Sequence, residues 1–114
     1  AQGEIIRRAA AFFEKYDALI CPATLCPPFD VNWRYPESWD GVAFAGYMGW
    51  LVLTYAVTMT ACPVLAMPGG FTPGGLPLGL QVIGRPRGEA QLFSHGAWLE
   101  QLLGLAGMTP LDPR

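Results

Sequence analysis

The order of apolar and polar positions predicts a helix near each end of the chain. Residues 4–16, EIIRRAAAFFEKY, repeat apolar side chains at helical spacing. Residues 89–104 repeat leucines along one side, and Gly104 is a residue type that commonly ends a helix. The uncharged run of residues 42–57 is apolar on every side, which predicts a third helix that is fully buried.

Short apolar runs between these helices predict three strands, over residues 18–21, 64–68 and 79–84. Glycine or proline closes each run before a helix could form. Residues 69–77 are rich in the same two residue types and predict a turn. Residues 22–41 contain four prolines and two tryptophans without a sustained period. We expect a long ordered loop there, and loops of that length usually serve a function.

This order of elements predicts an α/β fold in which helices cover a mixed sheet on both faces, followed by a loop over residues 105–114. Only 14% of the residues are charged and 52% are hydrophobic, whereas about 25% charged is usual. A compact body of 114 residues would expose much of that apolar surface. We therefore expect residues 1–114, which begin at Ala1 without a methionine, to be an internal piece of a larger single domain. The isolated chain should self-associate or need the missing amino-terminal part.

Charge and cysteine content argue against several classes of protein. The net charge is −2 and the arginines form no cluster, which disfavours nucleic-acid binding. The cysteine count is 3, and the spacing lacks the second pair of a zinc site, so we expect reduced thiols in a cytoplasmic protein. Charged residues interrupt the amino-terminal segment, so it is not a signal peptide. The run of residues 42–57 is too short for a transmembrane segment and has no basic flanks.

The chain lacks a convincing catalytic set of its own. Nucleophilic catalysis needs a serine, threonine or cysteine beside a base. Ser94 and His95 are adjacent on a predicted helix and diverge by about 100°, and His95 lies on the apolar side, as a core or interface histidine would. Cys62 has no cationic neighbour in its segment, and Asp30 suits a turn. We assign no catalytic residue, metal ligand or cofactor to this chain.

Residues 75–101, GLPLGLQVIGRPRGEAQLFSHGAWLEQ, closely resemble the carboxyl-terminal block of the amidase signature family. In that family a G-L-P-x-G-L-Q-x-I-G-x-P strand precedes a helix that starts with E-A and ends in E-Q. Two upstream stretches, YDALICPAT and TACPVLAMPGGF, resemble further family segments in the right order. The sequence departs from the family at Thr58, Ala61 and Ala66, where Asn, Gly and Ser are usual. Gln81 of the motif is expected to form hydrogen bonds at a strand edge rather than to bind substrate.

The resemblance implies a partial amidase-signature α/β fold and a parent enzyme that hydrolyses C–N amide bonds of a small-molecule substrate. The family's catalytic serine, bridging serine and lysine lie in a glycine- and serine-rich block without a counterpart here, so this chain alone should be inactive. The family also builds the wall of its acyl pocket from the apolar segment upstream of the TACP turn. The candidates in that segment are Met48, Trp50, Leu51 and Tyr55. An aromatic and aliphatic lining would favour an apolar or aryl acyl group, and core packing is the alternative role for each residue.

Two other interpretations stay open. The first is a non-enzymatic domain that binds a partner or a membrane through the uncharged residues 41–84. The second remains within the family: a piece of the amidotransferase component that feeds ammonia to a charged tRNA. The replacements at Thr58 and Ala61 weigh against this second interpretation.

Overall fold

The computed structural model describes residues 1–107, which form three helices, two short 3-10 helices and five strands. The helices are α1 (Gln2–Phe12), α2 (Val52–Thr58) and α3 (Glu89–Leu102), with 3-10 turns η1 (Gly49–Leu51) and η2 (Leu105–Gly107). The strands are β1 (Leu19–Pro22), β2 (Ser38–Trp39), β3 (Val42–Ala43), β4 (Val64–Phe71) and β5 (Pro77–Ile83). The predicted loop over residues 105–114 begins with η2, and its remainder lies outside the described residues.

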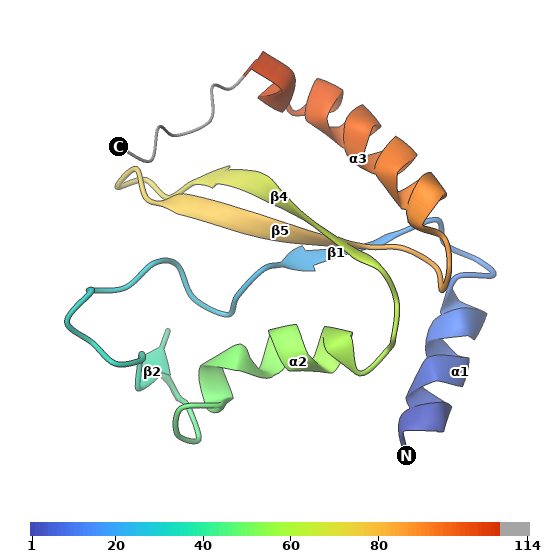
Figure 1. Ribbon diagram of the computed structural model, residues 1–114. Coiled ribbons are helices and arrows are strands. Elements are labelled where there is room, and N and C mark those ends of the chain that lie inside the picture. The colour runs from blue at the N-terminus through green and yellow to red at the C-terminus, as the bar shows by residue number, and fades with distance from the viewer. Residues whose placement is uncertain (108–114) are drawn as a thin grey trace.

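The main sheet has the order β1-β5-β4, so the strand formed by the GLPLGLQVI motif lies at its centre (Figure 1). Both neighbours pair with it antiparallel: Ile20 lies opposite Val82 on one side, and Leu65 lies opposite Val82 on the other. The three predicted strands and the α/β class are therefore confirmed. The sequence predicted a mixed sheet, whereas both pairings of this sheet within residues 1–107 are antiparallel.

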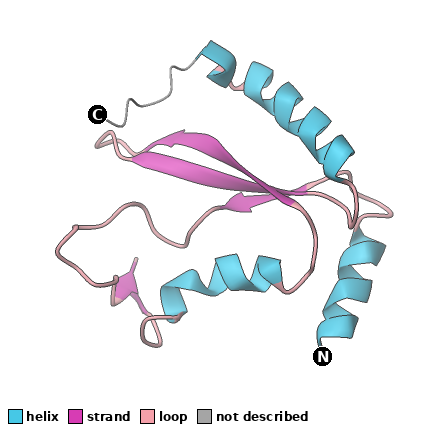
Figure 2. Cartoon of the chain, viewed as in Figure 1, coloured by secondary structure: helices cyan, strands magenta, loops and turns pink. Residues whose placement is uncertain are grey.

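Helices lie on both faces of this sheet, as the sequence predicted. Figures 1 and 2 show α3 on one side and α1 with α2 on the other. Beneath α3 the core consists of Met67, Val82 and Leu92, with Leu65 packed against it. Gly96 of α3 lies where the helix approaches β4 closely, because a Cβ there would overlap the end of the Leu65 side chain and force it or the helix to shift.

The predicted fully buried helix over residues 42–57 is wrong. Its first residues form β3, and only Gly49–Leu51 and Val52–Thr58 are helical, with Val57 as the buried residue of α2. The backbone of Gly46 has φ +70°, which a right-handed helix does not accommodate. The uniformly apolar residues 42–57 therefore form a hairpin strand, a turn and a short helix in succession rather than one helix.

Much apolar surface is exposed, as the composition implied. Trp98 and Leu102 of α3 are 61% and 64% exposed, and no residue of α1 is buried. Among the helices of residues 1–107, none combines the length and apolar character needed to cross a bilayer.

Candidate functional site

An apolar cavity of about 530 Å³ opens between the loop that leaves β1 and the far end of the β4–β5 hairpin. We call it the Trp50 cavity. Its lining is Pro22, Ala23, Thr24, Leu25, Cys26, Pro27, Pro28, Phe29, Trp50, Gly69, Pro77, Leu78, Gly79 and Leu80. Besides the indole N–H of Trp50, only a threonine hydroxyl and a cysteine thiol supply side-chain polarity in this set. Such a lining suits the apolar part of a small molecule.

One wall of this cavity is fixed by a buried glutamine on β5. Gln81 is 8% exposed, and its Nε2 donates to the carbonyl oxygens of Pro22 (3.2 Å) and Ala23 (3.4 Å). Thr54 Oγ1 of α2 also donates to the Ala23 carbonyl, at 3.3 Å. The backbone N–H of Ala23 donates to the carbonyl of Gly79 at 2.9 Å. Gln81 therefore forms the structural hydrogen bonds expected of it, from the central strand rather than from an edge.

Trp50 is the residue of the predicted pocket set that lines the cavity. It lies in η1, and its ring meets Phe29 edge to face, with centroids 5.5 Å apart. Its indole Nε1 is buried and has no acceptor among the described residues. The other three candidates lie outside the cavity lining: Met48 is 55% exposed, Tyr55 is 43% exposed and Leu51 is half-buried.

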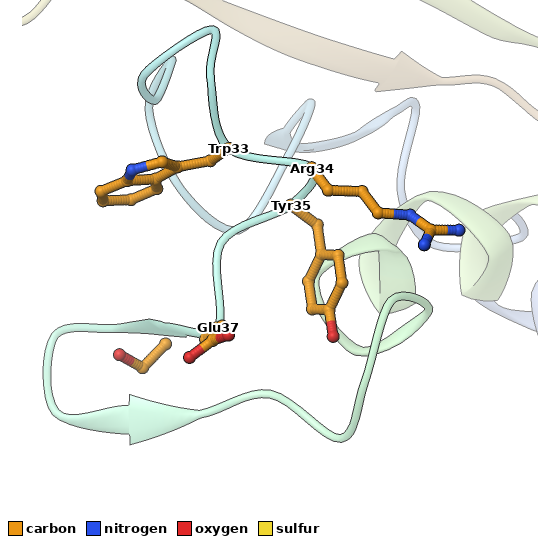
Figure 3. A pocket seen from close by; sticks show the side chains of 5 residues that line it. Trp33, Arg34, Tyr35 and Glu37 are labelled. Atoms are coloured by element: carbon orange, nitrogen blue, oxygen red, sulfur yellow. The ribbon is translucent and has the colours of Figure 1, made fainter.

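A second hollow, of about 460 Å³, is formed by the loop that follows (Figure 3). We call it the Trp33 hollow, and it is lined by Trp33, Arg34, Tyr35, Glu37 and Ser38. Phe29 stacks on Trp33 with ring centroids 6.4 Å apart, so an aromatic pair separates this hollow from the Trp50 cavity. The sequence pointed to the loop, but none of these five side chains was assigned to a site from it.

A third, narrower groove of about 310 Å³ runs between α1 and the sheet. Phe12, Leu19, Val57 and Ile83 are among its lining residues, and Arg8 is its charged member. Cys62 also lines this groove.

Two of the groups that could act as nucleophile or base, Ser94 and Asp30, are held in structural roles within residues 1–107. Ser94 Oγ donates to the carbonyl of Ala90 at 3.2 Å, which occupies its proton within α3. Asp30 Oδ1 accepts from the backbone N–H of Asn32 at 2.8 Å, the turn role predicted for it. His95 was expected to be a core or interface histidine, and its Nδ1 is buried without a partner in the described part of the chain.

The cysteines are free thiols. Burial raises the pKa of Cys21 and of Cys26, because the thiolate loses hydration. Both are therefore poor nucleophiles at neutral pH. No group of three histidine, cysteine or acidic side chains near enough to hold a metal ion occurs in the part of the chain that the structure describes.

Thr58 and Ala61, where the sequence departs from the family pattern, do not disrupt the backbone at the end of α2. Thr58 Oγ1 donates to the carbonyl of Thr54 at 3.0 Å, and the N–H of Ala61 donates to the carbonyl of Thr58 at 3.2 Å. Ala61 itself has φ +55°, a conformation that glycine adopts more easily.

Comparison with known proteins places these features in a family. The sequence pattern of the Amidase family matches residues 1–93. A subunit of the glutamyl-tRNA(Gln) amidotransferase of Roseobacter denitrificans is 39% identical over 93 residues, which cover 82% of this chain and 18% of that protein. The corresponding subunit of Xanthobacter autotrophicus is 39% identical over 101 residues, which cover 89% of this chain and 19% of that protein.

The solved structure of a bacterial aryl acylamidase belonging to the amidase signature family is similar, with a TM-score of 0.59 and 25% sequence identity. The match covers 80% of this chain and 19% of the acylamidase chain. This chain therefore spans about a fifth of the length of the relatives that it matches.

Proposed function

We propose that this chain, which belongs to the amidase signature family, serves as the carboxyl-terminal segment of an amidase domain. In this role the Trp50 cavity forms part of the pocket for the acyl group of a small-molecule amide. The observation that carries the proposal is an apolar cavity inside a family-matched segment, in which the Ser94 hydroxyl is committed to a hydrogen bond within α3. The groups that break the amide bond then belong to other parts of the domain.

The described residues support a role in binding and positioning. Trp50 and Phe29 present large aromatic surfaces that exclude water from an apolar acyl group. Gln81 and Thr54 hold the carbonyl of Ala23, and so hold the opposite wall. A wall that is fixed before substrate arrives helps to orient the acyl group, which favours attack on its carbonyl by a nucleophile from outside this chain.

Amide hydrolysis by the chain alone and by the full-length protein tests this proposal. We expect the chain alone to show no turnover above buffer, and the full-length protein to hydrolyse amides with aryl or branched acyl groups. Trp50→Ala in the full-length protein should raise KM for these substrates by about tenfold, because apolar contact with the acyl group is lost. Trp39→Ala is the matched control, because this exposed tryptophan of β2 does not line the cavity. Turnover by the isolated chain, or equal KM values for the two variants, would contradict the proposal.

A second candidate function is that of a component of an amidotransferase. It is favoured by the 39% identity to the glutamyl-tRNA(Gln) amidotransferase subunit of Roseobacter denitrificans. The likeness to an aryl acylamidase and the aromatic lining of the Trp50 cavity favour the amidase instead. Amidation of glutamyl-tRNA(Gln) by the full-length protein with its partner subunits, without hydrolysis of aryl amides, would decide for the amidotransferase.

We also infer a cytoplasmic location and an association of the exposed α3 surface with the rest of the amidase domain. The free thiols and the exposed Trp98 and Leu102 support these two inferences. Cell fractionation tests the first. Sedimentation tests the second, because the isolated chain should self-associate whereas the full-length protein should not.

A further inference from the structure

The Trp33 hollow has walls that are held by the fold of the loop itself. On one side, the N–H of Trp33 donates to the carbonyl of Asp30 at 3.0 Å, within the turn that Asn32 closes on the Asp30 carboxylate. At the back, Tyr35 meets Tyr47 edge to face, with ring centroids 5.6 Å apart. These contacts hold the backbone at Trp33 and the ring of Tyr35 without any ligand.

The opposite wall is set by a hairpin. Pro36 is fully buried and fixes the backbone just before Glu37, whose carbonyl accepts from the N–H of Phe44 at 2.8 Å. Ser38 begins β2, which pairs antiparallel with β3. The two residues between these strands, Asp40 and Gly41, both have positive φ, as a tight two-residue hairpin turn requires.

The lining carries one cation, Arg34, and one anion, Glu37, and its aromatic faces favour positive charge on the side of Glu37. The faces of Trp33 and Tyr35 carry negative electrostatic potential, and Glu37 adds a carboxylate. Within residues 1–107 this carboxylate has no ion-pair partner, since the ion pairs there all involve Glu4. Figure 3 shows the guanidinium group of Arg34 directed away from Glu37 and Trp33. An anionic ligand would be repelled by Glu37, and a neutral apolar ligand would leave it unused.

We propose that the Trp33 hollow binds an organic ammonium group between Trp33, Tyr35 and Glu37. This site is separate from the Trp50 cavity and needs no amide chemistry. Binding is measured without turnover, so a failure here is distinct from a failure of the amidase assignment.

Isothermal titration of the full-length protein with choline tests the proposal. Two comparison ligands isolate the role of charge: the uncharged analogue with a tert-butyl group in place of trimethylammonium, and the anion pivalate. We expect choline to bind about tenfold more tightly than its uncharged analogue, and pivalate to bind more weakly than both. Equal affinities for choline and its analogue, or tighter binding of pivalate through Arg34, would overturn the assignment.

Paired variants then locate the site. Trp33→Leu and Glu37→Gln should each weaken choline binding by about fivefold, since each removes one attractive group. Tyr16→Leu and Glu14→Gln are matched controls, because both residues are exposed and neither lines the hollow nor belongs to its hairpin wall. Circular dichroism checks that the folds of the variants are equal. If the controls weaken binding as much as the lining variants, choline binds elsewhere and the proposal fails.

Discussion

Replacing Ala61 by glycine should stabilise the protein, although it removes a methyl group. Ala61 follows α2 at φ +55°, and its N–H donates to the carbonyl of Thr58. This left-handed conformation brings the Cβ of an L-residue close to the following carbonyl oxygen. The amidase family usually has glycine here, so the substitution restores the residue type that the turn suits best.

The expected magnitude follows from two opposing terms. Holding a residue with a Cβ in the left-handed region costs about 1–2 kcal/mol, which glycine avoids. Glycine is also more flexible in the unfolded chain, which lowers the free energy of unfolding by about 0.5–1 kcal/mol. The net expectation is a gain of about 0.5–1 kcal/mol in the free energy of unfolding.

Chemical denaturation of the full-length protein measures this gain. Ala97→Gly is a matched control with the opposite expected sign, because Ala97 is exposed within the right-handed helix α3. There the same substitution should lower the free energy of unfolding by about 1 kcal/mol. If Ala61→Gly also destabilises the protein while the control behaves as expected, the backbone of Ala61 is not strained and the reasoning is refuted.

Three further substitutions or treatments give distinct outcomes. Gly96→Ala should destabilise the protein by about 1–3 kcal/mol in thermal unfolding, because the added Cβ overlaps Leu65; an unchanged melting temperature would show that α3 moves freely. Gln81→Leu should cost about 2 kcal/mol in chemical denaturation, since two donated hydrogen bonds are lost, and a neutral result would contradict the wall assigned to it. Alkylation of Cys21 and Cys26 by iodoacetamide should be slow at neutral pH, because burial raises the pKa of both thiols, and should accelerate only above the pH at which a free cysteine reacts. Rapid modification near pH 7, detected by mass spectrometry, would contradict this prediction.

The sequence predicted the main sheet and α3 well, because their signals are local. The run of residues 79–84 is apolar and closed by glycine, and it forms most of β5. The helix predicted over residues 4–16 exists, but α1 ends at Phe12, since the following residues form turns. The antiparallel pairing of β5 with β4 follows from the short predicted turn between them, since parallel strands need a much longer connection. The pairing of β5 with β1 was not predictable, because these strands are distant in the sequence.

The β2–β3 hairpin was missed despite a recognisable signal. Asp40 and Gly41 form the Asp-Gly pair that favours a two-residue hairpin turn, yet the strands around it are only two residues long. Two residues are too few to show alternation of polar and apolar side chains. The long apolar run that follows suggested a helix that began at Val42, and this assignment concealed the hairpin.

The difference between Trp50 and the other three predicted pocket residues follows from helix geometry. The candidates were chosen by their distance in sequence from the TACP turn, whereas a cavity selects side chains by direction. Trp50 and Leu51 are consecutive in a 3-10 turn, so their side chains diverge by about 120°. Tyr55 lies five residues beyond Trp50, which corresponds to about 140° around an α-helix. The helix face that carries Trp50 into the cavity therefore presents neither Leu51 nor Tyr55 to it. The second aromatic wall comes from Phe29 of the loop, where no periodicity exists to indicate it.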